Sequence, residues 1–233
     1  MVPWRELGRA KVGNGELVLA QRGDEFAIRL RGAELMNSRS HASEEMLAKL
    51  GCAGLGAVSG ARVLIGGLGM GFTARAALDL LPRDAQVTIA ELVPEVVEWN
   101  RTHLADLARR PLDDPRVTVQ IGDVADVIAA KQEAWNAILL DVDNGPDAFT
   151  SPSNAKLYGL KGLIAARRAL VPGGTYAVWS VENDKKFTDR MRGAALDPEW
   201  HKVPSRPNSN TKHVVWVGKR RPATKTRRND DQI

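Results

Sequence analysis

The chain has 233 residues, of which 43% are hydrophobic, and this suits one domain of ordinary size with a substantial core. A single cysteine, Cys52, excludes an internal disulfide, and no stretch approaches the roughly 18 apolar residues of a membrane span. The N-terminus also lacks the apolar stretch of a signal peptide. We therefore expect a cytoplasmic protein with no membrane partner.

The formal net charge of +5 is concentrated at the C-terminus. Residues 218–233 hold six Lys or Arg and two Asp, so the rest of the chain is close to neutral. This segment has no apolar periodicity, and we expect it to be disordered. Non-specific tail contacts with phosphates are the only nucleic-acid contacts that we expect.

The first elements along the chain are two short segments in which apolar and polar residues alternate, at 16–23 and 25–32. Gly23 and Asp24 lie at their junction and predict a tight turn, so the two segments predict a β-hairpin. A helix is predicted next, from Ser43 to Leu50.

From Ala61 onward, strand patterns alternate with helix patterns. Strands are predicted at 61–67, 86–92, 116–123, 136–143, 175–181 and 213–219, and helices at 72–82, 94–109, 124–132, 154–170 and 185–196. Such alternation predicts an α/β fold with a mostly parallel sheet covered by helices. Only a short helix and a polar loop separate the last two strands, which predicts an antiparallel strand at the sheet edge. The predicted organisation is therefore a hairpin and helix at 1–50, a Rossmann-like domain at 51–218 and a tail at 219–233.

A glycine cluster, Gly66, Gly67, Gly69 and Gly71, follows the strand at 61–67 and precedes a helix. Glycines at the carboxyl end of such a strand allow a tight turn and close approach to a ligand. Glu91 ends the next strand about 20 residues later, where a carboxylate can accept both ribose hydroxyls of an adenosine. NAD and S-adenosyl compounds both fit this spacing.

Acidic residues end the next two strands as well. Asp123 can accept a hydrogen bond from the adenine amine, or cap the following helix, or both. Asp141 and Asp143 follow a buried strand, where two carboxylates are costly unless they have a partner or a function. They can orient and deprotonate an amine or hold a cation, although turn chemistry alone also explains them.

The order of these motifs resembles the spermidine synthase family, which has the Rossmann-like class I S-adenosylmethionine-dependent methyltransferase fold. The segments that carry the resemblance are SEEML, VLIGGLGMG, VTIAELVPEVVEWNR, DPRVTVQIGD, ILLDVDNGP, LY and ALVPGG. It covers roughly residues 16–218 and implies a polyamine aminopropyltransferase that binds S-adenosylmethionine or its decarboxylated form.

The resemblance also implies roles for single residues. Asp141 would be the general base that takes a proton from the attacking amine, and Asp143 would hold that amine. Tyr158 follows the acidic loop and could cover the substrate or serve packing. The residues expected to contact the nucleoside are Gly66, Gly67, Gly69, Gly71, Glu91, Asp123 and Val124.

The chain departs from the family on the amine side. The family's glycine loop carries an acid that meets the aminopropyl amine, and Gly69 occupies that place here. The pair Ser43-Glu44 stands where the family has Tyr-His. We therefore expect putrescine to be a poor substrate even if aminopropyl transfer is the reaction.

Other functions remain open at this point. A methyltransferase that acts on oxygen or nitrogen of a small molecule would use the same nucleoside site, and so would a non-catalytic nucleoside-binding protein. An NAD dehydrogenase fits the order of motifs less well. The four histidines form no metal-ligand pattern, so no metal is expected. The partner is expected to be a small amine or another small nucleophile, and a homodimer stays open.

Overall fold

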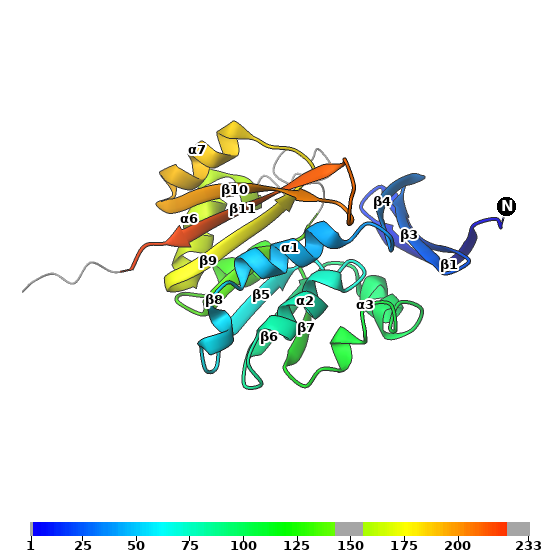
Figure 1. Cartoon of the computed structure of the whole chain (residues 1–233), viewed down its shortest axis with the longest axis horizontal. Helices are drawn as coiled ribbons and strands as arrows, with labels where there is room; N and C mark the ends of the chain where they lie inside the picture. Colours follow the sequence, from blue (N-terminus) through cyan, green and yellow to red (C-terminus); the bar gives the residue numbers. More distant parts are fainter. Residues whose placement is uncertain (1, 143–155, 223–233) are drawn as a thin grey trace, which may run out of the picture.

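The computed structural model describes residues 2–142 and 156–222. A seven-stranded sheet with helices on both faces forms the larger part of the molecule, and a four-stranded antiparallel sheet lies beside it (Figure 1). No helix in these two ranges is long and apolar enough to cross a membrane.

The large sheet has the order β10-β11-β9-β8-β5-β6-β7. Strands β7, β6, β5, β8 and β9 are parallel, and β11 is antiparallel to both of its neighbours. The central strands are continuous apolar runs buried on both faces, as parallel sheets require. The strands are β5 (Arg62–Gly66), β6 (Gln86–Glu91), β7 (Val117–Ile121), β8 (Trp135–Leu140), β9 (Leu170–Ser180), β10 (Leu196–Pro204) and β11 (Lys212–Arg220).

Two apolar cores lie on the two faces of this sheet. The first core contains side chains of α1 (Ala42–Gly51), α2 (Phe72–Leu80) and α3 (Pro94–Arg101). The second contains side chains of α4 (Val124–Ala129), α6 (Leu160–Ala169) and α7 (Lys185–Gly193). This arrangement brings the loops at the carboxyl ends of β5, β6, β7 and β8 to one edge of the sheet.

The N-terminal sheet is larger than the single hairpin predicted from the sequence. The hairpin is confirmed as β2 (Gly15–Arg22) and β3 (Glu25–Leu30), but β1 (Arg5–Val12) and β4 (Ala33–Asn37) extend it to the order β1-β2-β3-β4. The two outer strands were missed because β1 buries only Ala10 and β4 is short and partly exposed, so neither has a clear alternation.

The C-terminal part of the large sheet also differs from the prediction in detail. The antiparallel pairing of β9 with β11 is confirmed, but the edge strand is β10, in a segment predicted to be helix and loop. Its sequence LDPEWHKVP contains two prolines, which an edge strand tolerates because one side of its ladder is unpaired. The helix predicted at 94–109 ends at Arg101 and continues as turns.

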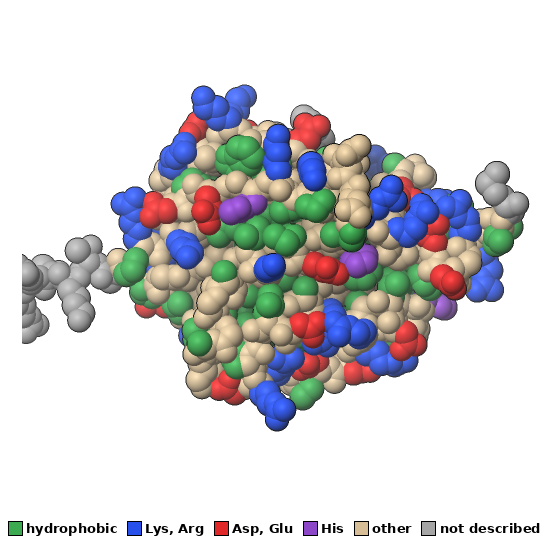
Figure 2. Space-filling model, in the orientation of Figure 1, with side chains coloured by type: hydrophobic (Ala, Val, Ile, Leu, Met, Phe, Trp, Pro, Cys, Tyr) green, Lys and Arg blue, Asp and Glu red, His purple; other side chains and the backbone are tan. Residues whose placement is uncertain are grey.

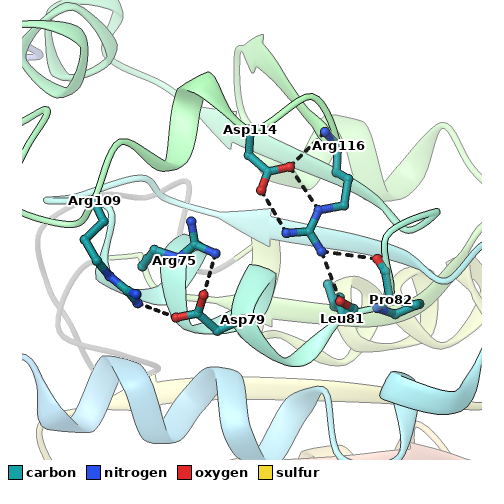
Figure 3. A network of polar contacts seen from close by, with 7 residues as sticks. All are labelled: Arg75, Asp79, Leu81, Pro82, Arg109, Asp114 and Arg116. Atoms are coloured by element: carbon teal, nitrogen blue, oxygen red, sulfur yellow. Dashed lines mark hydrogen bonds and ion pairs between the residues drawn. The ribbon is translucent and has the colours of Figure 1, made fainter.

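A network of charged side chains ties the end of α2 to the start of β7 (Figure 3). Arg116 forms two hydrogen bonds to the carboxylate of Asp114 and also donates to the carbonyls of Leu81 and Pro82. Both charged side chains are largely buried, so their planar pairing holds the loop after α2 against the strand. Asp79 accepts from Arg75 and Arg109 in the same network.

The last strand runs past the predicted start of the tail at residue 219. Arg220 belongs to β11 and donates to the carbonyl of Leu170 and to Glu133. Arg221 pairs with Asp197 on the surface, where both side chains are exposed. The anchored part of the C-terminus therefore ends near residue 221.

Deleting residues 221–233 is expected to change the melting temperature only slightly, because exposed ion pairs contribute little. Thermal unfolding of the full and shortened chains measures the difference. A matched deletion that begins at Arg220 should lower the melting temperature more, since it also removes the buried contacts of that side chain. A large loss from the shorter deletion would contradict the prediction and show that the tail packs on the domain.

Candidate active site

A cavity of about 1340 Å³ lies between the small sheet and the carboxyl ends of the parallel strands. Apolar side chains of the small sheet form one wall, and the loops after β5, β6, β7 and β8 form the other. Ligand sites in open α/β sheets occur at this edge. The predicted site residues among its lining are Gly67, Gly69, Glu91, Asp123, Val124 and Asp141.

The glycine loop approaches the backbone of Asp141 too closely for a side chain. Gly67 has a φ of +86°, and a Cβ built there would lie 2.3 Å from the carbonyl oxygen of Asp141. Its N–H donates to the carbonyl of Ala90 at 2.9 Å. The glycine therefore lets the loops after β5 and β8 meet at the cavity wall.

Gly67→Ala is expected to destabilise the fold because it adds a backbone clash to the strain of a positive φ, which alone costs about 1–2 kcal/mol. Gly173→Ala is the matched control, since Gly173 has a φ of +82° and open space around its Cβ position. Chemical denaturation of both variants measures the free energy of unfolding. If both variants lose the same free energy of unfolding, the clash of the new methyl group with the carbonyl of Asp141 does not contribute.

Glu91 at the end of β6 is anchored to the glycine loop. One carboxylate oxygen accepts from the N–H of Leu68 at 2.8 Å, and the other accepts from the N–H of Val93 at 2.9 Å. The residue is 8% exposed and lines the cavity. The carboxylate therefore holds the glycine loop and the loop after β6 together, and it does so at the wall of the cavity.

Asp123 caps α4 and lines the cavity at the same time. Its carboxylate accepts from the N–H of Ala125 at 2.8 Å, as the capping interpretation predicts. Val124 beside it is buried and packs against the strand end at Gly66. The pair can present one polar and one apolar surface to a planar base.

Asp141 follows β8 and is held by α2. Its N–H donates to the carbonyl of Gly66 at 2.8 Å, and its carboxylate accepts from the hydroxyl of Thr73 at 2.6 Å. Burial raises the pKa of this carboxyl above its ordinary value, against the opposing effect of the Thr73 hydrogen bond. A carboxylate with a raised pKa is a stronger base than an exposed one.

Glu44 was not among the predicted site residues, yet α1 brings it to the same cavity. The hydroxyl of Ser43 donates to its carboxylate at 2.6 Å. Burial raises the pKa of Glu44, and the charge of Asp141 raises it further. On the sequence, Glu44 is one of two adjacent glutamates in the first turn of a helix, and that pattern is typical of a solvated face.

The structure does not bring every predicted residue to the cavity. Gly66 and Gly71 are not among the lining residues that the structure describes. Gly71 is the N-cap of α2, and a Cβ built there would lie 3.0 Å from Oδ1 of Asn100 and from Cγ of Pro111. Tyr158 is buried, and its hydroxyl donates to the carbonyl of Val142. Asp143 lies outside the described residues.

No group of three or more His, Cys, Asp or Glu side chains within residues 2–142 and 156–222 is arranged to hold a metal ion. Glu44 and Asp141, which line both this cavity and a smaller hollow beside it, therefore have no third ligand among the described residues. What the arrangement can do is bind a nucleoside at the loops after β5, β6 and β7, and place a base beside it.

Comparison of the sequence with known proteins finds similar enzymes but no matching family model. A polyamine aminopropyltransferase of Mycobacterium tuberculosis is 34% identical over 170 residues, which are 70% of this chain and 30% of that protein. A polyamine aminopropyltransferase of a Synechococcus strain is 36% identical over 87 residues, which are 37% of this chain and 28% of that protein. The chain thus spans about a third or less of these relatives' own length.

Solved structures match over most of the chain. Spermidine synthase from Thermotoga maritima aligns with a TM-score of 0.73 and 18% identity, over 93% of this chain and 73% of that one. A spermidine synthase in complex with the transition-state analogue AdoDATO aligns with a TM-score of 0.72 and 17% identity, over 93% and 72%.

The strand order and the site loops define a class I methyltransferase-like fold of the spermidine synthase type, as the sequence predicted. Within that fold, the chain is similar in sequence to polyamine aminopropyltransferases over as much as 70% of its own length.

Proposed function

We propose that this chain is a transferase that moves an aminopropyl group from decarboxylated S-adenosylmethionine to a small amine. The observation that carries the proposal is the position of Asp141, a carboxylate of raised pKa at the wall of a cavity whose loops suit a nucleoside. The relatives named polyamine aminopropyltransferase support it.

The reaction needs little from the protein beyond positioning and proton transfer. The amine nitrogen attacks the aminopropyl carbon next to the sulfonium, a C–N bond forms and the C–S bond breaks. The bonding electrons return to sulfur, and methylthioadenosine leaves as a neutral thioether. Asp141 accepts the proton that the nitrogen loses, and Thr73 keeps its carboxylate oriented.

Nucleoside binding would rest on residues already ordered without a ligand. Glu91 would accept the ribose hydroxyls while it keeps its two backbone N–H donors. Asp123 and Val124 would flank the adenine from the loop after β7. Preorganisation of this kind lowers the entropy cost of binding.

Calorimetry with S-adenosylmethionine, its decarboxylated form, methylthioadenosine and NAD tests the nucleoside site. We expect the S-adenosyl compounds and methylthioadenosine to bind and NAD to fail. An assay with a panel of amines then tests the reaction. Release of methylthioadenosine supports aminopropyl transfer, and release of S-adenosylhomocysteine would show methyl transfer instead. If the nucleosides bind and neither product forms with any amine, the proposed reaction is wrong.

A further inference from the structure

Glu44 and Asp141 are far apart in the sequence, but both reach the same part of the cavity. Glu44 lies in the first turn of α1, and Asp141 follows β8. Both also line a small side hollow of about 20 Å³, together with Gly69 and Met36. This hollow is therefore next to the loop position at which the family resemblance implies an acid.

The two carboxylates have no cationic partner among the described side chains. Each is bound by a hydroxyl, Glu44 by Ser43 and Asp141 by Thr73, and no described Lys or Arg shifts the pKa of either. Arg31 and Arg206 line the same large cavity but form no ion pair with them. Glu44 and Asp141 are both partly buried, and the charge of one raises the pKa of the other, so the pair is costly without a counter-charge and a bound cation lowers that cost.

A second, independent feature of the same cavity suits an organic cation. Trp179 lines the cavity and is 9% exposed, and its ring centroid lies 4.8 Å from that of His213, which contacts Ser43 beside Glu44. Among aromatic side chains, the indole ring binds an ammonium group most favourably through a cation–π interaction. A metal ion needs oxygen, nitrogen or sulfur ligands and does not need such a ring.

The neighbouring histidine adds no positive charge. Nδ1 of His213 lies 2.9 Å from the hydroxyl oxygen of Ser43. Because the Ser43 proton goes to Glu44, His213 is the donor in this contact. Burial lowers the pKa of His213, so the ring is neutral near pH 7. The charged groups that face Glu44 are then Asp141 and the adjacent Glu45, both anionic.

We propose that Glu44 binds the ammonium group at the end of the donor's aminopropyl arm, and that α1 thereby supplies the carboxylate that the glycine loop lacks at Gly69. This inference rests on the proposed function and names the residue that selects the donor. A carboxyl group on the arm, as in S-adenosylmethionine, would face two like charges, so the site favours the decarboxylated donor.

Three stable thioether nucleosides separate the contributions, because none carries the sulfonium charge. Methylthioadenosine has no charged arm, S-adenosyl-3-thiopropylamine adds an ammonium, and S-adenosylhomocysteine adds an ammonium and a carboxylate. Calorimetry with the wild-type chain should rank the amine tightest, at least tenfold above methylthioadenosine. Glu44→Gln should weaken the amine about tenfold or more and leave methylthioadenosine unchanged. Glu45→Gln, on the exposed side of the same turn, is the matched control and should change neither.

Proton release gives a second readout. Since Glu44 holds its proton more tightly than an ordinary glutamate, binding of the ammonium should expel that proton near neutral pH. Calorimetric titrations with S-adenosyl-3-thiopropylamine in buffers of different ionisation enthalpy measure the number of protons released on binding. The wild-type chain should release more protons than Glu44→Gln.

The outcomes distinguish the inference from the proposed function. If methylthioadenosine fails to bind the wild-type chain, the nucleoside site and the inference both fail. If it binds, but Glu44→Gln holds the amine as tightly as the wild type, only the role of Glu44 is overturned. Magnesium binding to the wild-type chain that is lost in Glu44→Gln would overturn it too, because Glu44 would then be a metal ligand.

Discussion

Asp141→Asn is expected to lower the rate of aminopropyl transfer by about 10²–10⁴-fold, the usual contribution of a positioned base. Asparagine keeps the shape of the side chain and can still accept the Thr73 hydrogen bond, but it cannot take the proton of the attacking amine. Single-turnover rates and nucleoside affinity should be measured together, and the affinity should stay almost unchanged.

The pH dependence of the same reaction follows from the raised pKa of Asp141. The base works only when ionised, so kcat/KM should fall as the pH drops through that raised pKa, at a higher pH than for an ordinary aspartate. Asp143→Asn serves as a comparison, since a lost carboxylate there should act mainly on the apparent affinity for the amine. If Asp141→Asn retains full activity, or activity requires magnesium, Asp141 is not the base.

Glu91→Ala is expected to abolish most nucleoside binding and also to loosen the glycine loop. Two hydrogen bonds from ribose to a charged acceptor would be lost, each worth about 1.5–3 kcal/mol. The N–H groups of Leu68 and Val93 would lose their acceptor as well, at about 1–3 kcal/mol for each one left buried without a partner.

Calorimetry with methylthioadenosine and chemical denaturation measure the two effects of Glu91→Ala separately. Glu98→Ala is the control, because Glu98 is exposed on the neighbouring helix α3. A folded Glu91→Ala variant with unchanged nucleoside affinity would remove Glu91 from the binding site.

The sequence predicted the parts of the site that follow strand ends. Gly67, Glu91, Asp123 and Asp141 each lie at the carboxyl end of a strand of the parallel sheet or within two residues of it, and parallel strands bring these ends to one edge. The proximity of these residues therefore follows from the local strand patterns and from the parallel arrangement of the strands.

The remaining site residues depend on packing between segments far apart in the chain. Glu44 belongs to α1, Trp179 lies near the end of β9 and His213 lies near the start of β11, so no spacing rule relates them. Their proximity depends on α1 packing across the large sheet, which no motif in the sequence specifies. The outer strands β1, β4 and β10 escaped prediction for a different reason: edge strands bury few side chains, and alternation is weak in them.

Charge is distributed over the surface without a dominant sign on the face that Figure 2 shows, where cationic and anionic side chains intermingle. The acidic groups inside the cavity therefore differ from their surroundings.

The two walls of the cavity belong to different sheets. The wall proposed to bind the nucleoside is made from loops of the large sheet, whereas Leu17, Ile28 and Leu30 of the small sheet line the opposite wall. Substitutions in the small sheet can therefore reshape the space for the acceptor without disturbing Glu91 or the glycine loop. Under the proposed function, the range of acceptor amines and the recognition of the donor would be separable traits, because a change of amine would need no change in the loops proposed to bind adenosine.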